Sequence, residues 1–330
     1  MSHEALAKWK LLTFDFFNMF TLIKTKDLKT IKDVFKKLNL PKDNSHKGQN
    51  GKVLIIGGSS LFHAASLWAA ETASYFVDMV HYCSTEENEK IFLNLKTKFR
   101  NGIVIPRKNL MDYVEEDDAV LVGPGMVRKD ISNIKNQISK MHFKNQKDLI
   151  NIKDEGLYTH FLTKFLIENF PEKKFVFDAG VLQMMEKERL LKLKVPAIIT
   201  PHQKEFERLF GEKILDLEFD KKLELVKKYA KKYQVIILLK AVRDIVSNGE
   251  KVYVIDGGNQ GLTKGGSGDV LAGLAVSFYA KNFPLESAIF SSIILKIAAD
   301  ELLLEKGYWY NINNLIEKIP RVLKKIVFNL

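Results

Sequence analysis

Short β-branched runs that alternate with helical patterns constrain the fold of this chain more than any other feature of its sequence. From Lys52 onward, seven runs have the length and composition of buried strands, at residues 53–56, 79–83, 103–105, 119–122, 174–177, 197–200 and 235–239. Between them, apolar residues recur at helical spacing over residues 64–76, 157–170, 203–210 and 217–232. The alternation predicts an α/β domain with a mostly parallel central sheet and helices on both faces.

The pattern changes after Lys240. Two short runs, 244–247 and 251–255, are joined by Asn248 and Gly249, a strong signal for a two-residue β-hairpin. Three helices are then predicted, one beginning after Ser267 and the others over residues 285–306 and 312–327.

Two segments fall outside this pattern. Residues 11–23 are apolar but interrupted by Asp15 and Asn18, and no small-residue cleavage site follows, so we interpret them as an amphipathic part of an N-terminal extension, residues 1–44. The lysine- and asparagine-rich residues 129–155 are interpreted as a partly helical surface insertion. The main domain is expected over residues 45–330.

Composition excludes several classes of protein. The 330 residues are 46% apolar, enough for a large core, yet no run of about 18 apolar residues predicts a membrane-spanning helix. The single cysteine, Cys83, has no partner for an internal disulfide and is expected to be a buried apolar residue in a reducing, cytoplasmic compartment. The net charge of +11 favours phosphate-bearing ligands, but lysines alternate with acids such as Glu86 and Asp220, so nucleic-acid binding is not favoured.

The segment most informative about function is the glycine-rich run GLTKGGSGDVLAG at residues 261–273. Glycines allow the backbone to approach a ligand closely, and the helix that follows offers unpaired N–H groups for an anion. The amides of Gly266, Ser267 and Gly268 are therefore predicted to hold phosphate. Asp269 is a poor phosphate ligand but suits the role of a base acting on a substrate hydroxyl. Alternatively, Asp269 only complements the dipole of the helix.

Other polar candidates stand at predicted strand ends. Gly125 follows the strand that ends at Val122, in a Gly-Pro-Gly turn. His202 and Glu205 follow another strand and lie one helical turn apart, on the same face of a helix. Lys240 ends a strongly apolar strand. Ligands collect at the carboxyl ends of strands in α/β sheets, so these positions are candidates for binding.

Each of these residues also has a purely structural interpretation. Gly125 could belong to an ordinary tight turn. His202 could be a packed or solvated side chain, and Glu205 a first-turn acid. Lys240 could be an edge-strand lysine. Asp178, which follows another predicted strand, could be only a helix cap.

The glycine turn after the first predicted strand does not indicate a dinucleotide-binding dehydrogenase. Gly57 and Gly58 are adjacent, which is not the spacing Gly-x-Gly-x-x-Gly, and no acidic residue stands at the expected following strand end.

The Gly-x-Gly-Asp turn that opens an apolar helix resembles the ribokinase-like superfamily. The longer string from Asn259 to Gly273, together with the opening loop and first strand between Ser45 and Ser59, is similar to the NAD(P)H-hydrate dehydratases. The resemblance extends from about Ser45 to Leu304. It implies a ribokinase-like fold in which Asp269 is the catalytic base and the preceding amides form the anion hole.

The resemblance also implies the remaining site residues. It places Ala65, Gly125, His202 and Asp269 against the substrate, and Glu205 in a magnesium and phosphate network that it joins indirectly. The expected nucleotide-binding residues are Lys240, Ala241, Val242, Arg243, Asp244 and Gly268. Four residues depart from the family pattern: Val127, Gly180, Ala241 and Asp244.

The implied activity is nucleotide-dependent dehydration of hydrated NADH or NADPH, with ADP or ATP as co-substrate, Mg²⁺ as cofactor and a homotetrameric assembly. A small-molecule kinase of the same superfamily is the alternative enzyme, and a nucleotide-binding protein without turnover is the alternative suggested by the departures. Relatives are often fused to an epimerase domain, for which the 44 residues before Ser45 are expected to be too few.

Overall fold

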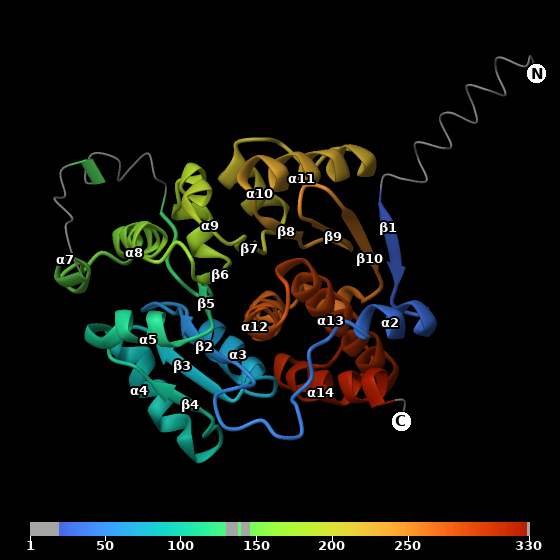
Figure 1. Ribbon diagram of the computed structural model, residues 1–330, viewed down its shortest axis with the longest axis horizontal. Helices are drawn as coiled ribbons and strands as arrows, with labels where there is room; N and C mark the ends of the chain where they lie inside the picture. Colours follow the sequence, from blue (N-terminus) through green and yellow to red (C-terminus); the bar gives the residue numbers. More distant parts are fainter. Residues whose placement is uncertain (1–19, 130–137, 140–145, 329–330) are drawn as a thin grey trace, which may run out of the picture.

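A single twisted sheet organises the molecule (Figure 1). The computed structural model describes residues 20–129, 138–139 and 146–328, and within this part of the chain ten strands pair in the order β1-β10-β9-β8-β7-β6-β5-β2-β3-β4. All neighbouring pairs are parallel except those of β9, which runs antiparallel to β8 and β10. The strands are β1 (Thr21–Lys24), β2 (Lys52–Ile56), β3 (Met79–Cys83), β4 (Gly102–Val104), β5 (Ala119–Val122), β6 (Lys174–Phe177), β7 (Ile198–Ile199), β8 (Ile236–Leu239), β9 (Arg243–Ser247) and β10 (Val252–Asp256).

Helices cover both faces of this sheet (Figure 1). One face packs against α2 (Leu28–Phe35), α3 (Ala64–Ala73), α12 (Ser267–Lys281), α13 (Pro284–Lys306) and α14 (Ile312–Phe328). The other face packs against α5 (Leu110–Glu116), α7 (Gln146–Ile150), α8 (Glu155–Asn169), α9 (Gly180–Met184), α10 (Gln203–Phe210) and α11 (Phe219–Tyr233). Helix α4 (Glu86–Asn94) lies beside β4, and short 3₁₀ turns include η4 (Gln260–Thr263).

The interior strands are buried on both sides, which explains their unbroken apolar sequences. In β2, Val53 and Ile55 contribute to the core under α3 and α12, whereas Leu54 and Ile56 contribute to the opposite core. Cys83, at the end of β3, is fully buried as expected, and burial raises the pKa of its thiol to about 12.

The predicted α/β architecture, a mostly parallel sheet with helices on both faces, is confirmed, and so is the hairpin of β9 and β10. The sequence analysis did not find β1, α2, α4, α5 or α9. Strand β1 lies within the expected N-terminal extension but pairs with β10. Helix α2 also lies in this extension, and it buries Ile31 and Phe35 in the core that α12, α13 and α14 form with the sheet. Of the segment 129–155, α7 and the start of α8 are helical, and residues 130–137 and 140–145 lie outside the described residues.

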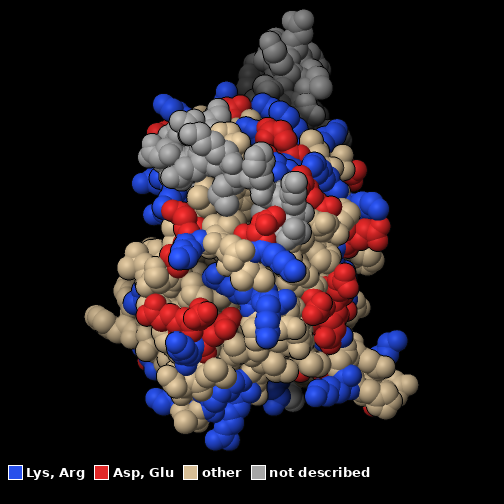
Figure 2. Space-filling view, turned by 90° about the vertical axis from the view of Figure 1, so that its left-hand side faces the viewer, with Lys and Arg blue, Asp and Glu red and all other residues tan. Residues whose placement is uncertain are grey.

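No helix among the described residues is long and apolar enough to span a bilayer. On the face shown in Figure 2, basic and acidic side chains are interspersed and do not form a single basic stripe.

Candidate active site

The carboxyl ends of the central parallel strands meet at one edge of the sheet, and the predicted site residues gather there. Asp178 follows β6, His202 follows β7 and Lys240 follows β8 directly. Helix α12 begins at the same edge. Its first residues, Ser267 and Gly268, line a cavity together with His202 and Lys240.

The start of α12 requires a glycine at position 266. Gly266 caps the helix with φ 107°, a backbone conformation that other residues adopt only with strain. A β-carbon at this position would lie 2.6 Å from the Trp68 ring and 2.7 Å from Ile312. The Ser267 hydroxyl donates to the carbonyl of Leu262 at 2.6 Å and fixes the turn before the helix.

The first-turn amides of α12 differ in how free they are. The Ser267 N–H donates to the carbonyl of Lys264 at 3.3 Å. The Gly268 N–H lies in the first helical turn, where an amide has no acceptor within the helix. Of the two, Gly268 is therefore the freer donor toward a ligand.

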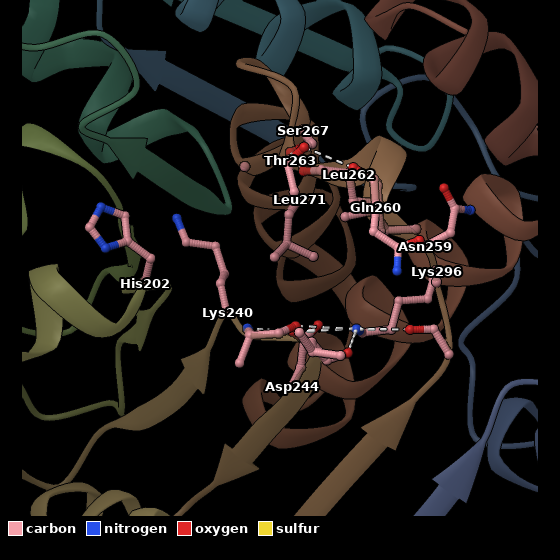
Figure 3. Close-up of a pocket in the computed structure, with 16 residues that line it drawn as sticks. His202, Lys240, Asp244, Asn259, Gln260, Leu262, Thr263, Ser267, Leu271 and Lys296 are labelled. Carbon is pink, nitrogen blue, oxygen red and sulfur yellow. Dashed lines mark hydrogen bonds and ion pairs between the residues drawn. The ribbon is translucent and has the colours of Figure 1, made fainter. Parts of the chain in front are cut away.

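A first cavity of about 430 Å³ lies between the start of α12 and the β8–β9 turn (Figure 3). Of the residues expected to bind nucleotide, Lys240, Ala241, Val242, Asp244 and Gly268 line it, and so does His202, expected from the resemblance to contact substrate. Arg243 does not line this cavity. Its guanidinium lies over the Phe219 ring, 4.0 Å from the ring centroid.

A second cavity of about 670 Å³ lies on the other side of the same helix start. Ala65, Gly125 and Asp269, three of the expected substrate contacts, line it together with Glu205 and Gly266. The sequence analysis missed several further lining residues, among them Phe62, His63, Trp68, Met126, Arg128 and Gln183. The first turn of α12 thus separates the two cavities, with Gly268 on one side and Asp269 on the other.

Lys240 joins the acidic groups of the site. Its ammonium donates to Oδ1 of Asp178 at 2.8 Å and lies 3.7 Å from Oε2 of Glu205. The buried Asp178 carboxylate also accepts from the Thr200 hydroxyl at 2.7 Å. Burial alone would lower the pKa of Lys240, but the attraction of Asp178 and Glu205 outweighs it and raises the pKa. Because β8 lies between β7 and β9, Lys240 is not an edge-strand lysine.

The Asp269 carboxyl is poised to exchange protons near neutrality. Burial, followed by the negative charge of Asp178, raises its pKa to about 7, while the cation of Lys240 opposes this shift. A carboxyl with such a pKa is matched to general-base catalysis at neutral pH. The pKa of Asp269 is therefore set by its own burial, by the anions of Asp178 and Glu205, and by the cation of Lys240.

His202 and Glu205 form a reciprocal cap at the start of α10. The Glu205 N–H donates to Nδ1 of His202 at 3.2 Å, and the His202 N–H donates to Oε2 of Glu205 at 2.9 Å. Burial lowers the pKa of His202, which favours the neutral imidazole. The pair therefore has a structural role, and it also spans the site, since His202 lines the first cavity and Glu205 the second.

Comparison with known proteins identifies the family. The family model described as NAD(P)H-hydrate dehydratase matches residues 53–321. The chain belongs to the NAD(P)H-hydrate dehydratase family. It is 30% identical to an ADP-dependent (S)-NAD(P)H-hydrate dehydratase of Nitrosopumilus maritimus, covering 86% of this chain and 92% of that protein.

Some family relatives are about twice as long as the matched region. The chain is 34% identical to a bifunctional NAD(P)H-hydrate repair enzyme of Methanocaldococcus jannaschii, over 85% of this chain but 50% of that protein. The chain therefore spans about half the length of the bifunctional relative and nearly all of the relative from Nitrosopumilus.

Solved structures agree with the fold of this dehydratase family. A ribokinase-like protein from Enterococcus faecalis superimposes with a TM-score of 0.72 at 19% identity, covering 94% of this chain and 97% of that one. The ADP/ATP-dependent NAD(P)H-hydrate dehydratase of Bacillus subtilis, crystallised with ATP and Mg²⁺, gives 0.66 at 19% identity, with 90% and 97% covered. At these identities the likeness shows the fold.

One departure from the dehydratase pattern has a packing explanation. At Gly180, one of the four departures from the family pattern, a β-carbon would lie 2.2 Å from the carbonyl oxygen of Met126. The preceding residue, Ala179, lines the second cavity with φ 50°, a strained conformation for alanine. Position 180 therefore has no room for a side chain larger than that of glycine.

The residues of this site suit an indirectly held Mg²⁺. Among the described residues, no group of three or more His, Cys, Asp or Glu side chains is arranged to hold a metal ion. Mg²⁺ typically binds through one or two carboxylates together with substrate phosphates. Glu205 and Asp178 supply buried carboxylates beside the start of α12, which fits that mode of binding.

Proposed function

We propose that this chain catalyses the nucleotide-dependent dehydration of hydrated NADH or NADPH and so restores the reduced coenzyme. The observation that carries the proposal is the position of Asp269, a carboxyl with a pKa of about 7 at a helix start that separates two cavities. One cavity is large enough for a nucleotide and the other for part of a second substrate, and the family membership names both classes of ligand.

In the first step, Asp269 accepts the proton of the hydroxyl on the hydrated nicotinamide ring. The hydroxyl oxygen then attacks the terminal phosphoryl group of ADP or ATP, forming a phosphate ester and releasing AMP or ADP. The Gly268 amide at the start of α12, together with those of Gly266 and Ser267, stabilises the charge that develops on the transferred group.

In the second step, the ring loses phosphate and the adjacent proton, with electrons supplied from the ring nitrogen, and the reduced nicotinamide re-forms. The net reaction is dehydration coupled to hydrolysis of one phosphoanhydride bond. Ala65, Gly125 and Asp269 bind the hydrated coenzyme in the second cavity, where Trp68 and Phe62 add aromatic surface. His202, from the rim of the first cavity, completes the contact between the two ligands.

The nucleotide binds in the first cavity, against Lys240, Ala241, Val242, Asp244 and Gly268. Arg243 does not contact the nucleotide. It supports the β8–β9 turn from outside the cavity, because its guanidinium packs on the Phe219 ring. Mg²⁺, bound with the nucleotide and held indirectly through Glu205, supplies charge neutralisation for the phosphates. The B. subtilis structure with ATP and Mg²⁺ and the ADP-dependent relatives support this pairing of ligands.

The test is incubation of the purified protein with chemically hydrated NADH and either ADP or ATP, following the return of reduced-nicotinamide absorbance and the release of phosphate together. We expect both signals to depend on nucleotide and to rise in equal amounts. A stable phosphate ester without recovery of NADH would indicate a kinase of the same fold. Nucleotide binding without either signal would indicate a protein that has lost turnover.

We also propose a cytoplasmic location and a homo-oligomer, a homotetramer by resemblance to the family. The lone, buried Cys83 supports a reducing compartment. Light scattering coupled to gel filtration tests the assembly, and a mass of one chain would contradict it.

A further inference from the structure

A buried lysine that the sequence analysis did not single out lies in the wall of the first cavity. Lys296, on α13, is 3% exposed, and its ammonium lies 3.5 Å from Oδ1 of Asp244. Asp244 is one of the two residues, with Ala241, that depart from the family pattern in the nucleotide segment. Figure 3 shows the two side chains side by side below the cavity, joined by dashed lines.

The Lys296 ammonium connects two different loops. It donates to the carbonyl of Val242, in the β8–β9 turn, at 2.9 Å and to the carbonyl of Gly257, just after β10, at 3.2 Å. Both residues line the first cavity. The third hydrogen-bond acceptor of the ammonium is the carbonyl of Ala241, at 3.5 Å, and the Asp244 carboxylate is its ion-pair partner. The three N–H donors of the ammonium therefore all have protein acceptors, and none is left for a ligand.

Asp244 completes the connection from the other side. Its Oδ1 accepts from the Ala241 N–H at 2.9 Å, inside the same turn, and its Oδ2 accepts from the Ser292 hydroxyl at 2.7 Å. Ser292 and Lys296 lie four residues apart on α13, hence on one face of that helix. The pair thus fastens the β8–β9 turn and the Gly257 loop to a single rigid helix.

We infer that the Lys296–Asp244 pair is a positioning device that sets the spacing of these two loops and thereby the affinity of the first cavity for adenine nucleotide. The inference rests on the proposed function only in assigning a nucleotide to that cavity. An ion pair buried in a cavity wall costs desolvation energy and is weak evidence for stability, so a role in geometry accounts for it better than a role in folding.

Three variants separate geometry from folding. Lys296→Met leaves the Asp244 charge buried without its cation, so we expect a lower melting temperature and a dissociation constant for nucleotide raised about tenfold. The double variant D244N/K296M leaves no buried charge and keeps an oxygen that accepts from the Ala241 N–H. Its melting temperature should recover toward that of the wild type, while its dissociation constant stays raised.

Lys174→Met is the matched control. Lys174 is also partly buried and also donates to two backbone carbonyls, those of Tyr279 and Ala280, but these lie at the far end of α12 and none of the three residues lines the cavity. We expect this variant to lower the melting temperature without changing the dissociation constant.

Calorimetry with ADP and with ATP on all four proteins decides the inference. A positioning role predicts the same fold-loss for both nucleotides. A larger loss for ATP would make Lys296 a phosphate ligand. A double variant that recovers affinity along with melting temperature would make the pair purely structural. Either result would overturn this inference and leave the proposed function standing. Failure of the wild-type protein to bind either nucleotide would overturn the proposed function and this inference with it.

Discussion

The ammonium of Lys240 lies 2.8 Å from Oδ1 of Asp178, and the two groups act on Asp269 in opposite directions. Asp178 raises the pKa of Asp269 and Lys240 lowers it, with burial adding the largest upward shift, so the carboxyl titrates at about 7. A general base must be ionised to work. We therefore expect kcat/KM for the hydrated coenzyme to rise with pH, with a midpoint near 7 and a plateau above it. A rate that stays constant from neutral to mildly acidic pH would contradict this assignment.

Replacing Asp178 by asparagine should move the same midpoint to lower pH. The amide keeps an oxygen for Lys240 and Thr200 but removes the negative charge that disfavours the ionised form of Asp269. Lys240→Met removes the opposing cation and should move the midpoint to higher pH. Profiles of kcat/KM against pH for the two variants check this. Midpoints that shift in the same direction in both variants would show that Asp178 and Lys240 do not act oppositely on the pKa of Asp269.

Asp269→Asn should abolish most turnover while nucleotide binding remains. The amide cannot accept the hydroxyl proton, and loss of a general base costs on the order of 10²–10⁴-fold in rate. The backbone N–H groups at the start of α12 are unchanged by this substitution. Calorimetry and absorbance on one preparation measure binding and turnover, and a melting curve checks folding. Turnover near the wild-type rate would remove Asp269 from the mechanism.

Adjacent glycines in the same turn should respond very differently to alanine. At Gly266, with φ 107°, the new methyl group would collide with Trp68 and Ile312, so we expect a loss of about 1–3 kcal/mol in the free energy of unfolding. At Gly265 a β-carbon meets nothing within 4 Å, so Gly265→Ala is the matched control and should change stability by about 0.5 kcal/mol or less. Denaturant titrations test this, and equal losses would show that the turn adapts to a side chain at either position.

The interior of the sheet could be predicted from sequence because strands buried on both faces have continuous apolar runs, as in β2 and β5. The edge could not. In β1 only Ile23 is buried, so the strand has neither an apolar run nor a full alternation to reveal it. Helix α4 was missed because Phe92 is its only buried apolar residue, which leaves no apolar repeat to detect, and α5 was missed because it has only seven residues.

Individual site segments could likewise be predicted, because glycine turns and polar strand ends are local features of the sequence. Their mutual placement could not. That His202 lines the first cavity, or that Arg243 lies on Phe219, depends on how separate strands are ordered in the sheet. Lys296 was missed for the same reason. A lysine within an apolar stretch of a helix is detectable, but its partners Val242 and Gly257 lie 54 and 39 residues away in the sequence.

The pairing of β1 with β10 has a consequence for how the chain folds. Thr21 is opposite Tyr253, so the first described strand completes the sheet only after the last strand has been made. Contacts between such distant parts of a chain form slowly, because a long loop must close before they contribute. During synthesis β1 is unpaired until β10 has been made, and β10 has an open edge until β1 pairs with it. An unpaired edge is a template for association between chains. We therefore expect late docking of the N-terminal strand to be a step at which this protein is exposed to aggregation.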